Sequence, residues 1–309
     1  MQVMVTGGAG FIGSHLVDRL LKDGFKVRVI DNLFRGKREN IAAHLNHPDF
    51  EFFEDDIRDY ERIRTRFENC HIVFHLAAQS NVMGAVENLD YSFNTNVVGT
   101  FNVLKAAREA GVRRLIFTSS REAYGEAQYL PVDEKHPLNS KNTYGASKVA
   151  GEKYCQVFHN MGAFETVILR LANVYGERDF DRVIPIFLNN VARHEDIHVF
   201  GGKQVIDFVS IEIVVQALME AMENKKAAEG PTNIGSGRET TLFQLAERIM
   251  QLTGSHNKVV VDPPRSVEVV KFTADIRRFK SIFNVDVPQD PLYYLETMIR
   301  KKGKSREVK

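Results

Sequence analysis

Short apolar runs alternate with amphipathic segments through the first 170 residues of the chain. Runs rich in apolar and β-branched residues predict strands, and apolar positions spaced three and four apart predict helices. The expected strands cover residues 2–5, 26–30, 50–53, 72–76, 115–118 and 166–170. The expected helices cover residues 14–21, 60–67, 94–110 and 144–161. Such alternation predicts an α/β fold whose parallel sheet is covered by helices on both faces.

After about Arg170 the alternation becomes less regular. Helices are expected at residues 185–193, 209–223, 242–253 and 291–301, with short strands at 197–200 and 259–261. We therefore expect a doubly wound parallel sheet of the Rossmann type over residues 1–170, to which later segments return. Residues 171–309 should mainly form a smaller C-terminal lobe. Ligands of such folds lie beyond the carboxyl ends of the strands, so this lobe should cover the ligand site.

A glycine-rich turn joins the first strand to the first helix. The turn contains Gly7, Gly10 and Gly13, with Phe11 and Ile12 between them, and Ser14–Leu21 continue as an amphipathic helix. Glycines permit a tight turn and let backbone N–H groups approach a pyrophosphate, and the helix N-terminus favours the same anion. The turn therefore predicts a dinucleotide site.

An acidic residue, Asp31, ends the second expected strand. An acid at this position accepts hydrogen bonds from the ribose hydroxyls of NAD and repels a 2′-phosphate. Arg35, Lys37 and Arg38 follow closely, so the sequence favours NAD and leaves NADP open. Residues 55–57 follow the third strand, where an adenine edge would lie. The alternative is an acidic helix N-cap at Asp59, and the two are compatible.

The composition of the chain limits the classes of binding partner and the cellular compartments that are compatible with it. The chain has 309 residues, of which 43% are hydrophobic and 26% charged, and its net charge is +1. So small a charge gives no global field for nucleic acid, and no apolar stretch is long enough for a membrane span. Cys70 and Cys155 are the only cysteines, which favours a reducing, cytoplasmic location, and no Cys/His cluster suggests a metal.

Tyr144 and Lys148 stand four residues apart at the start of an expected helix and therefore share one face. A cationic lysine beside a phenol favours the phenolate, which would make Tyr144 a base near neutral pH. Ser120 ends the preceding strand and could hydrogen-bond the same substrate hydroxyl. The alternative for this serine is a helix cap or a turn.

Segments along nearly the whole chain carry a family resemblance. They are Thr6–His15, Asp31–Leu33, Asp56–Ile57, His75–Ala78, Asn96–Thr100, Ser119–Gly125, Tyr144–Lys148, Arg170–Gly176 and Asn233–Gly237. In this order the chain resembles an extended short-chain dehydrogenase/reductase of the NAD-dependent sugar-nucleotide epimerase/dehydratase family. The motifs are specific for the family and the fold, and much less specific for the substrate.

The resemblance implies that NAD is the cofactor and a nucleotide sugar the substrate. The residues it implies around NAD are Gly7, Gly10, Phe11, Ile12, Gly13, Asp31, Asn32, Asp56, Ile57, Leu76, Ala77, Ala78, Asn96, Tyr144 and Lys148. The catalytic residues it implies are Ser120, Tyr144 and Lys148. On the substrate side it implies Asn173 and Arg265 for the diphosphate, Glu268 for a ribose, and Phe200 beside the nucleotide base.

Ile206 departs from the family pattern, which has an arginine two residues before the aromatic residue at 208. The departure removes a bidentate anion clamp. Arg178, Arg182 and Lys203 are candidates to replace it, unless the substrate is held differently.

Arg121 and Glu122 form a second departure, because the 4,6-dehydratases of the family have an Asp-Glu pair there. With arginine in place of the aspartate no obvious donor remains for a leaving hydroxyl, which disfavours a dehydratase. Arg121 could instead bind a substrate carboxylate, as on a uronic acid, or the two residues could form a structural ion pair. Phe272 occupies a position that gates the sugar pocket in the 4-epimerases, where bulk favours plain hexoses over N-acetylhexosamines.

These observations and the resemblance lead us to expect an NAD-dependent nucleotide-sugar 4-epimerase acting on UDP-glucose and UDP-galactose or a close relative. The alternatives are a 4,6-dehydratase, a net reductase, and an epimerase of another sugar such as a UDP-uronic acid. The intact pair of Tyr144 and Lys148 argues against a non-catalytic NAD-binding protein. The resemblance also implies a homodimer in which helices 94–110 and 144–161 pair across a two-fold axis.

Overall fold

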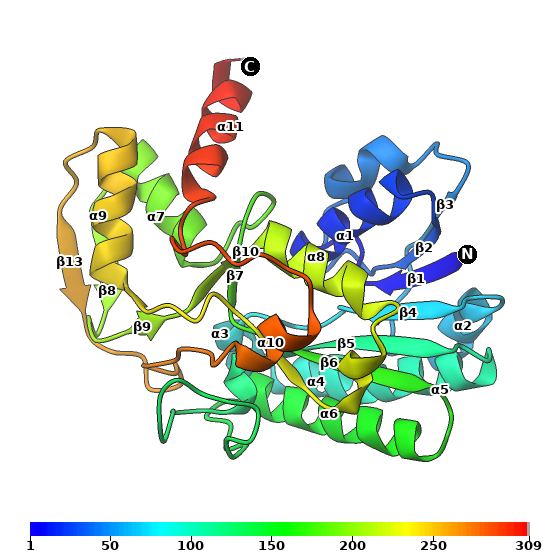
Figure 1. Ribbon diagram of the computed structural model, residues 1–309. Coiled ribbons are helices and arrows are strands. Elements are labelled where there is room, and N and C mark those ends of the chain that lie inside the picture. The colour runs from blue at the N-terminus through cyan, green and yellow to red at the C-terminus, as the bar shows by residue number, and fades with distance from the viewer. Residues whose placement is uncertain (308–309) are drawn as a thin grey trace.

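The computed structural model describes the backbone of residues 1–307 and the side chains of residues 1–301 (Figure 1). Its centre is a seven-stranded parallel sheet with the strand order β11-β6-β5-β4-β1-β2-β3. The strands are β1 (Gln2–Thr6), β2 (Lys26–Ile30), β3 (Phe50–Phe53), β4 (Ile72–His75), β5 (Arg114–Ser120), β6 (Glu165–Leu171) and β11 (Thr232–Ile234). The order reverses between β1 and β4, so the expected doubly wound fold is confirmed.

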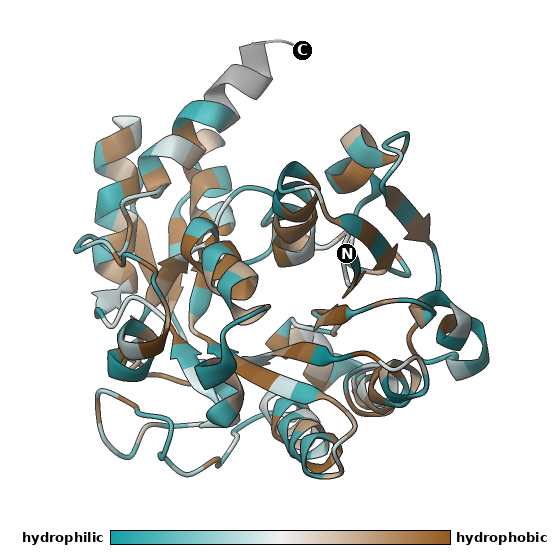
Figure 2. Ribbon diagram, turned by 45° about the vertical axis from the view of Figure 1, so that its right-hand side comes forward, coloured by the Kyte–Doolittle hydropathy of each residue, from teal (hydrophilic) through white to brown (hydrophobic). Residues whose placement is uncertain are grey.

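Helices cover both faces of this sheet (Figure 1). On one face lie α4 (Leu89–Phe93), α5 (Thr100–Glu109) and α6 (Thr143–Asn160), and on the other α1 (Phe11–Lys22) and α8 (Ile211–Ala221). Alternate residues of β1 take part in two different apolar clusters, Val3 and Val5 in one and Met4 in the other. Figure 2 shows the apolar residues gathered on the strands and on the helix faces that turn toward them. Burial on both faces explains why these strands are almost entirely apolar.

A smaller lobe stands beside the sheet, at the left of Figure 1. It contains α7 (Val183–Ala192), α9 (Leu242–Thr253), α11 (Leu295–Glu307), β8 (Ile197–Phe200), β9 (Val205–Ile206), β12 (Thr240–Thr241) and β13 (Val259–Asp262). The strands pair as β8 with β13 in parallel and β9 with β12 in antiparallel orientation. A capping box between Thr241 and Gln244 starts α9, and Gly254 ends it in the left-handed conformation. The remaining elements are α2 (Tyr60–Ile63), α3 (Val82–Glu87), α10 (Arg277–Ile282), β7 (Asn173–Tyr175) and β10 (Phe208–Ser210).

The later half of the chain returns to the sheet at two places. β11 pairs in parallel with β6 at its edge, and α8 packs against α1. The sequence shows no strong signal for β11, because it is only three residues long and Asn233 stands at its centre. The expected helix 209–223 begins two residues later, since Phe208–Ser210 pairs as a strand with β7.

The expected single helix at 94–110 is wrong in one respect. α4 runs into a π-helical segment, Asn94–Gly99, before α5 begins at Thr100. Hydrophobic spacing does not detect one such turn, because the apolar positions on either side remain compatible with a helix. Similarly, the expected helix 60–67 divides into α2 and a 3₁₀ segment, Arg64–Phe67. No helix in the described part of the chain is long and apolar enough to span a membrane.

Candidate active site

A cavity of about 430 Å³ opens at the carboxyl ends of the parallel strands. Its walls come from the glycine turn after β1, from the ends of β2, β4, β5 and β6, and from the smaller lobe, which contributes Phe200 and Leu242. This volume lies within the usual range for small-molecule sites. The expected position of the ligand site, between the sheet and the second lobe, therefore contains a cavity.

The glycine turn leaves backbone N–H groups available to an anion. Gly7 has a φ of +75°, and a Cβ atom there would lie 2.7 Å from the backbone of Ala77. A Cβ atom on Gly13 would lie 2.1 Å from the carbonyl oxygen of Gly7, so only glycine permits the close turn. The N-cap residue of α1 is Gly10, which has no side chain to cap the helix, so the first N–H groups of α1 are left to a phosphate.

Asp31 lies at the end of β2 and is buried in the cavity wall. Its carboxylate accepts hydrogen bonds from the backbone N–H groups of Ala9 (3.0 Å) and Leu33 (2.9 Å). Burial is the largest influence on this group and raises its pKa above the ordinary value. Each carboxylate oxygen keeps further acceptor capacity, so the residue can still receive ribose hydroxyls.

Most of the residues implied around NAD line this cavity. They are Gly7, Gly10, Phe11, Ile12, Gly13, Asp31, Asn32, Ile57, Leu76, Ala77, Ala78, Tyr144 and Lys148. Asp56 and Asn96 do not line it. Asp56 accepts a hydrogen bond from the amide of Asn32, and Asn96 holds the loop at Gln79 through hydrogen bonds to both its N–H and its C=O. These two residues thus hold other residues in place by hydrogen bonds and do not line the cavity themselves.

Ser120, Tyr144 and Lys148 come together at the carboxyl end of β5 and the start of α6. Lys148 donates a hydrogen bond of 2.9 Å to the carbonyl oxygen of Thr118, and its Nζ lies 5.7 Å from the ring centroid of Tyr144. Asn142 caps α6 by accepting a hydrogen bond from Gly145 N–H, which fixes the helix start that carries Tyr144.

Burial, and not the charge of Lys148, has the largest influence on the pKa of Tyr144. Burial raises the pKa of Tyr144 to about 12. The positive charges of Arg182 and Arg35 and a hydrogen bond from Ser120 oppose this rise. Burial also lowers the pKa of Lys148 to about 8. Without the cofactor, desolvation of the phenolate outweighs nearby positive charge, and the expectation that Lys148 and a positive nicotinamide ring favour the phenolate stays a prediction.

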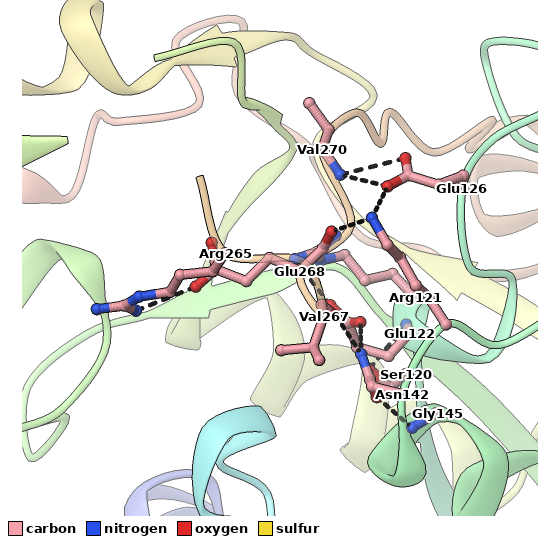
Figure 3. A network of polar contacts seen from close by, with 11 residues as sticks. Ser120, Arg121, Glu122, Glu126, Asn142, Gly145, Arg265, Val267, Glu268 and Val270 are labelled. Carbon is pink, nitrogen blue, oxygen red and sulfur yellow. Dashed lines mark hydrogen bonds and ion pairs between the residues drawn. The ribbon is translucent and has the colours of Figure 1, made fainter. Parts of the chain in front are cut away.

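Arg121 and Glu122 lie beside Ser120 in the cavity wall and form an ion pair of 2.9 Å (Figure 3). Asn142 donates a second hydrogen bond, of 2.7 Å, to the Glu122 carboxylate. The structural ion pair, one of the alternatives for these residues, is thus present. The Arg121 guanidinium remains in the wall of the cavity, with its carbon 5.9 Å from the ring centroid of Phe272.

The other implied substrate residues occupy the part of the cavity bordered by the smaller lobe. The guanidinium of Arg265 lies 3.7 Å from the ring centroid of Phe200. Arg265 also pairs with Glu268 at 3.1 Å (Figure 3). Asn173 also lines the cavity, and its side-chain oxygen is buried without a hydrogen-bond partner among the described residues. Phe272 differs, because it is 2% exposed and is absent from the cavity wall formed by the described side chains.

Ile206 itself lines the cavity, and the structure separates the three candidate replacements for an arginine at this position. Arg178 pairs with Asp18 at 2.7 Å and lies outside the wall, and Lys203 is outside it as well. Arg182 lines the cavity, where it pairs with Asp179 at 3.0 Å and lies over the ring of Phe11. Among these three cations, Arg182 alone reaches the cavity.

Sequence reasoning missed several residues of the wall. The main ones are Phe34, Asn81, Tyr91, Asp179, Phe180, Asp181 and Gln204. Phe34 and Tyr91 stack at 4.3 Å beside Asn32, although they are far apart in the sequence. No motif marks these positions, since each belongs to a loop or to a short helix whose place depends on the whole fold.

The sequence of this chain is similar to those of known proteins. The model of the NAD dependent epimerase/dehydratase family matches residues 3–235. A putative UDP-glucose 4-epimerase of Methanocaldococcus jannaschii is 39% identical over 287 residues, which cover 91% of this chain and 92% of that protein. UDP-glucuronic acid decarboxylase 4 of Arabidopsis thaliana is 34% identical over 291 residues, which cover 91% of this chain and 64% of that protein.

A solved structure matches the whole fold. UDP-glucose 4-epimerase from Thermotoga maritima, in complex with UDP-glucose, superposes with a TM-score of 0.92 and 35% identity. The match covers 99% of this chain and 100% of that one. The chain therefore belongs to the NAD-dependent epimerase/dehydratase family of extended short-chain dehydrogenases/reductases, and its cofactor is NAD.

Proposed function

We propose that this protein is an NAD-dependent nucleotide-sugar 4-epimerase whose substrates are UDP-glucose and UDP-galactose. The observation that carries the proposal is the meeting of Ser120, Tyr144 and Lys148 in one cavity with the glycine turn. The names of the relatives from M. jannaschii and T. maritima support the sugar. When bound, NAD supplies the acceptor that takes a hydride from carbon 4 of the sugar and returns it to the opposite face.

The residues of this chain have distinct tasks in that reaction. Tyr144 takes the proton of the C4 hydroxyl, and Ser120 donates a hydrogen bond to the same oxygen. Lys148 holds the ribose of the nicotinamide, and Asp31 holds the ribose of the adenosine. The reaction requires that the 4-keto sugar turns about its diphosphate within the cavity that these residues line.

We assign the diphosphate to Asn173, Arg265 and Arg182. The buried amide oxygen of Asn173 has no partner among the described residues, so its side chain is free to reorient toward a ligand. Arg265 and Arg182 each have one carboxylate partner, and a guanidinium has five N–H donors, so both retain donors for phosphate oxygens. These two cations compensate for the isoleucine at 206.

The first prediction concerns Tyr144. Tyr144→Phe removes the proton acceptor and keeps the ring, so kcat should fall by about 10²–10⁴-fold while NAD stays bound. Proton NMR of the anomeric signals during conversion of UDP-galactose to UDP-glucose measures the rate, and absorbance of the released nucleotide measures bound NAD. Near-normal turnover in Tyr144→Phe would rule out this mechanism.

A UDP-uronic acid is the second candidate substrate, because the Arg121 guanidinium lies in the wall beside Ser120. Arginine matches the geometry of a carboxylate, and carbon 6 of a hexose is close to the reacting carbon 4. We expect Arg121→Gln to lower kcat/KM for a UDP-uronic acid at least tenfold, roughly the value of one charge-assisted hydrogen bond, and to leave UDP-galactose within about threefold. An equal loss of kcat/KM for both sugars would show that Arg121 does not bind a substrate carboxylate, and that its role is limited to the ion pair with Glu122.

A 4,6-dehydratase remains the less favoured hypothesis for the function. Elimination of water needs a proton donor near the leaving hydroxyl, and the Glu122 carboxylate is engaged by Arg121 and Asn142. Accumulation of a 4-keto-6-deoxy sugar in the same NMR experiment would establish a dehydratase and overturn the proposed epimerase.

We also propose that the protein is a homodimer. Large apolar side chains are exposed along α4, α5 and α6: Leu89, Phe93, Phe101, Tyr154, Val157 and Met161. Phe101 and Tyr154 lie 5.4 Å apart between ring centroids, so α5 and α6 expose them side by side. Exposed apolar side chains on neighbouring helices are typical of a protein interface, and a second copy of the same helices would cover them.

A further inference from the structure

Three cations follow Asp31 in the loop where the adenosine ribose of the cofactor binds. An arginine in this loop is the usual partner of the 2′-phosphate that distinguishes NADP from NAD. Arg35, Lys37 and Arg38 therefore require an explanation in a protein whose cofactor is NAD. In the structure each of the three already has a partner.

Arg35 is held from across the cavity by Asp181. Its Nη2 atom donates to both carboxylate oxygens of Asp181, at 2.9 and 2.7 Å, although the two residues are 146 positions apart. Both side chains line the cavity, and each is only about one fifth exposed, at 22% and 23%. Asn81 donates a further hydrogen bond of 3.0 Å to Asp181, so the carboxylate is fixed from two sides.

The other two cations are directed elsewhere. The Nζ atom of Lys37 lies 4.4 Å from the ring centroid of Phe180, the residue before Asp181. Arg38 pairs with Glu54 at 3.7 Å and is absent from the cavity wall formed by the described side chains. Arg35 is thus the cation of this loop that both lines the cavity and is restrained by an acid.

We propose that Asp181 determines cofactor specificity through Arg35. By holding the guanidinium in a two-point ion pair, Asp181 withholds the one loop cation in the cavity that could receive a 2′-phosphate. Its own negative charge adds to the repulsion exerted by Asp31. Asp181 is accordingly a positioning residue for the cofactor, and the inference does not depend on which sugar is the substrate.

The test is a comparison of NAD⁺ and NADP⁺ in displacing NADH from the full-length protein, followed by the fluorescence of bound NADH. Asp181→Asn keeps the shape of the side chain and removes the charge that holds Arg35. We expect the affinity for NADP⁺ relative to NAD⁺ to rise at least about tenfold, which is the value of one charge-assisted hydrogen bond to phosphate.

Two further variants separate this explanation from simple removal of a negative charge. Arg35→Gln breaks the same ion pair without freeing a cation, so it should not raise the affinity for NADP⁺. Asp181→Asn combined with Arg35→Gln should lose the gain seen in the single variant. Glu54→Gln is the matched control, because it releases Arg38 outside the cavity wall and should leave the preference unchanged.

Circular dichroism and thermal melting establish that each variant is folded before it is titrated. An unchanged preference in folded Asp181→Asn would overturn the proposal. A gain that persists in the double variant would also overturn it, because the effect would then come from the charge of Asp181 alone. A wild-type protein that does not convert UDP-galactose, with the cofactor preference of the variants altered as expected, would contradict the proposed substrate and leave this inference intact.

Discussion

Lys148 and Tyr144 are both enclosed in the wall of the cavity, and burial moves their pKa values apart. The pKa of Lys148 is lowered to about 8, and that of Tyr144 is raised to about 12. At neutral pH the lysine is therefore still a cation and the tyrosine still a phenol. Turnover requires that the bound substrate and cofactor help the phenol to release its proton, since burial outweighs the nearby positive charges of the protein.

We predict that kcat for UDP-galactose falls as the pH rises through about 8. Below this value Lys148 is cationic and stabilises negative charge on Tyr144, and above it the lysine is neutral and the stabilisation is lost. A profile of kcat between pH 6 and pH 10 at saturating substrate checks the prediction. A constant kcat up to pH 10 would contradict it, provided the protein remains folded and loaded with NAD over this range.

The π-helical segment Asn94–Gly99 is the clearest case of an element that shapes the site from outside it. Asn96, within this segment, bonds to both backbone groups of Gln79 and donates to the hydroxyl of Ser147 on α6. It thereby connects the loop after β4 to the helix that carries Tyr144 and Lys148. π-helical turns often occur at functional sites, and here the extra residue in the turn coincides with a buried polar link.

Asn96→Ala should weaken NAD binding about threefold to tenfold, although Asn96 does not line the cavity. The change removes buried hydrogen bonds worth roughly 0.5–1.5 kcal/mol each, and the loop that carries Ala77 and Ala78 loses its anchor. Calorimetric titration with NAD⁺ measures the effect. Asn257→Ala is a suitable control, because its amide also donates to a backbone carbonyl, in the smaller lobe, and should leave the affinity for NAD⁺ unchanged.

At the scale of the whole molecule, the outer surface of α4, α5 and α6 links the proposed dimer to the active site. The inner surfaces of α5 and α6 pack on the sheet, where Val103, Leu104, Cys155 and Phe158 are buried. Their outer surfaces carry large apolar side chains that remain exposed in a single chain. A partner on this surface would restrain α6, whose first turn holds Tyr144.

Val157→Glu should convert the proposed dimer into a monomer. The side chain of Val157 lies on the outer surface of α6, where the residue is 50% exposed, so a charge there should disrupt the interface without disturbing the core. Light scattering coupled to gel filtration gives the molar mass. Val261→Glu is the matched control, since Val261 is 55% exposed on β13 in the other lobe, and it should leave the mass unchanged. A wild-type protein that is already a monomer would refute the dimer.

The sequence by itself determined the doubly wound sheet, the glycine turn and the meeting of Ser120, Tyr144 and Lys148. These features depend on local patterns: apolar periodicity specifies each element, and strand ends carry their functional residues to one edge of a parallel sheet. The cavity residues at Gly7 and Asp31 were predictable for the same reason, because each stands next to a strand end.

Only the tertiary structure decided which side chains complete the site. Arg178 and Arg182 are four residues apart, yet one pairs with Asp18 outside the cavity and the other lines it. Asp181 meets Arg35 across 146 residues of sequence. Such contacts leave no periodic or local signal, because they arise from the packing of loops after the sheet has formed. The fold therefore followed from patterning, whereas the electrostatics of the cavity followed from contacts between residues distant in the chain.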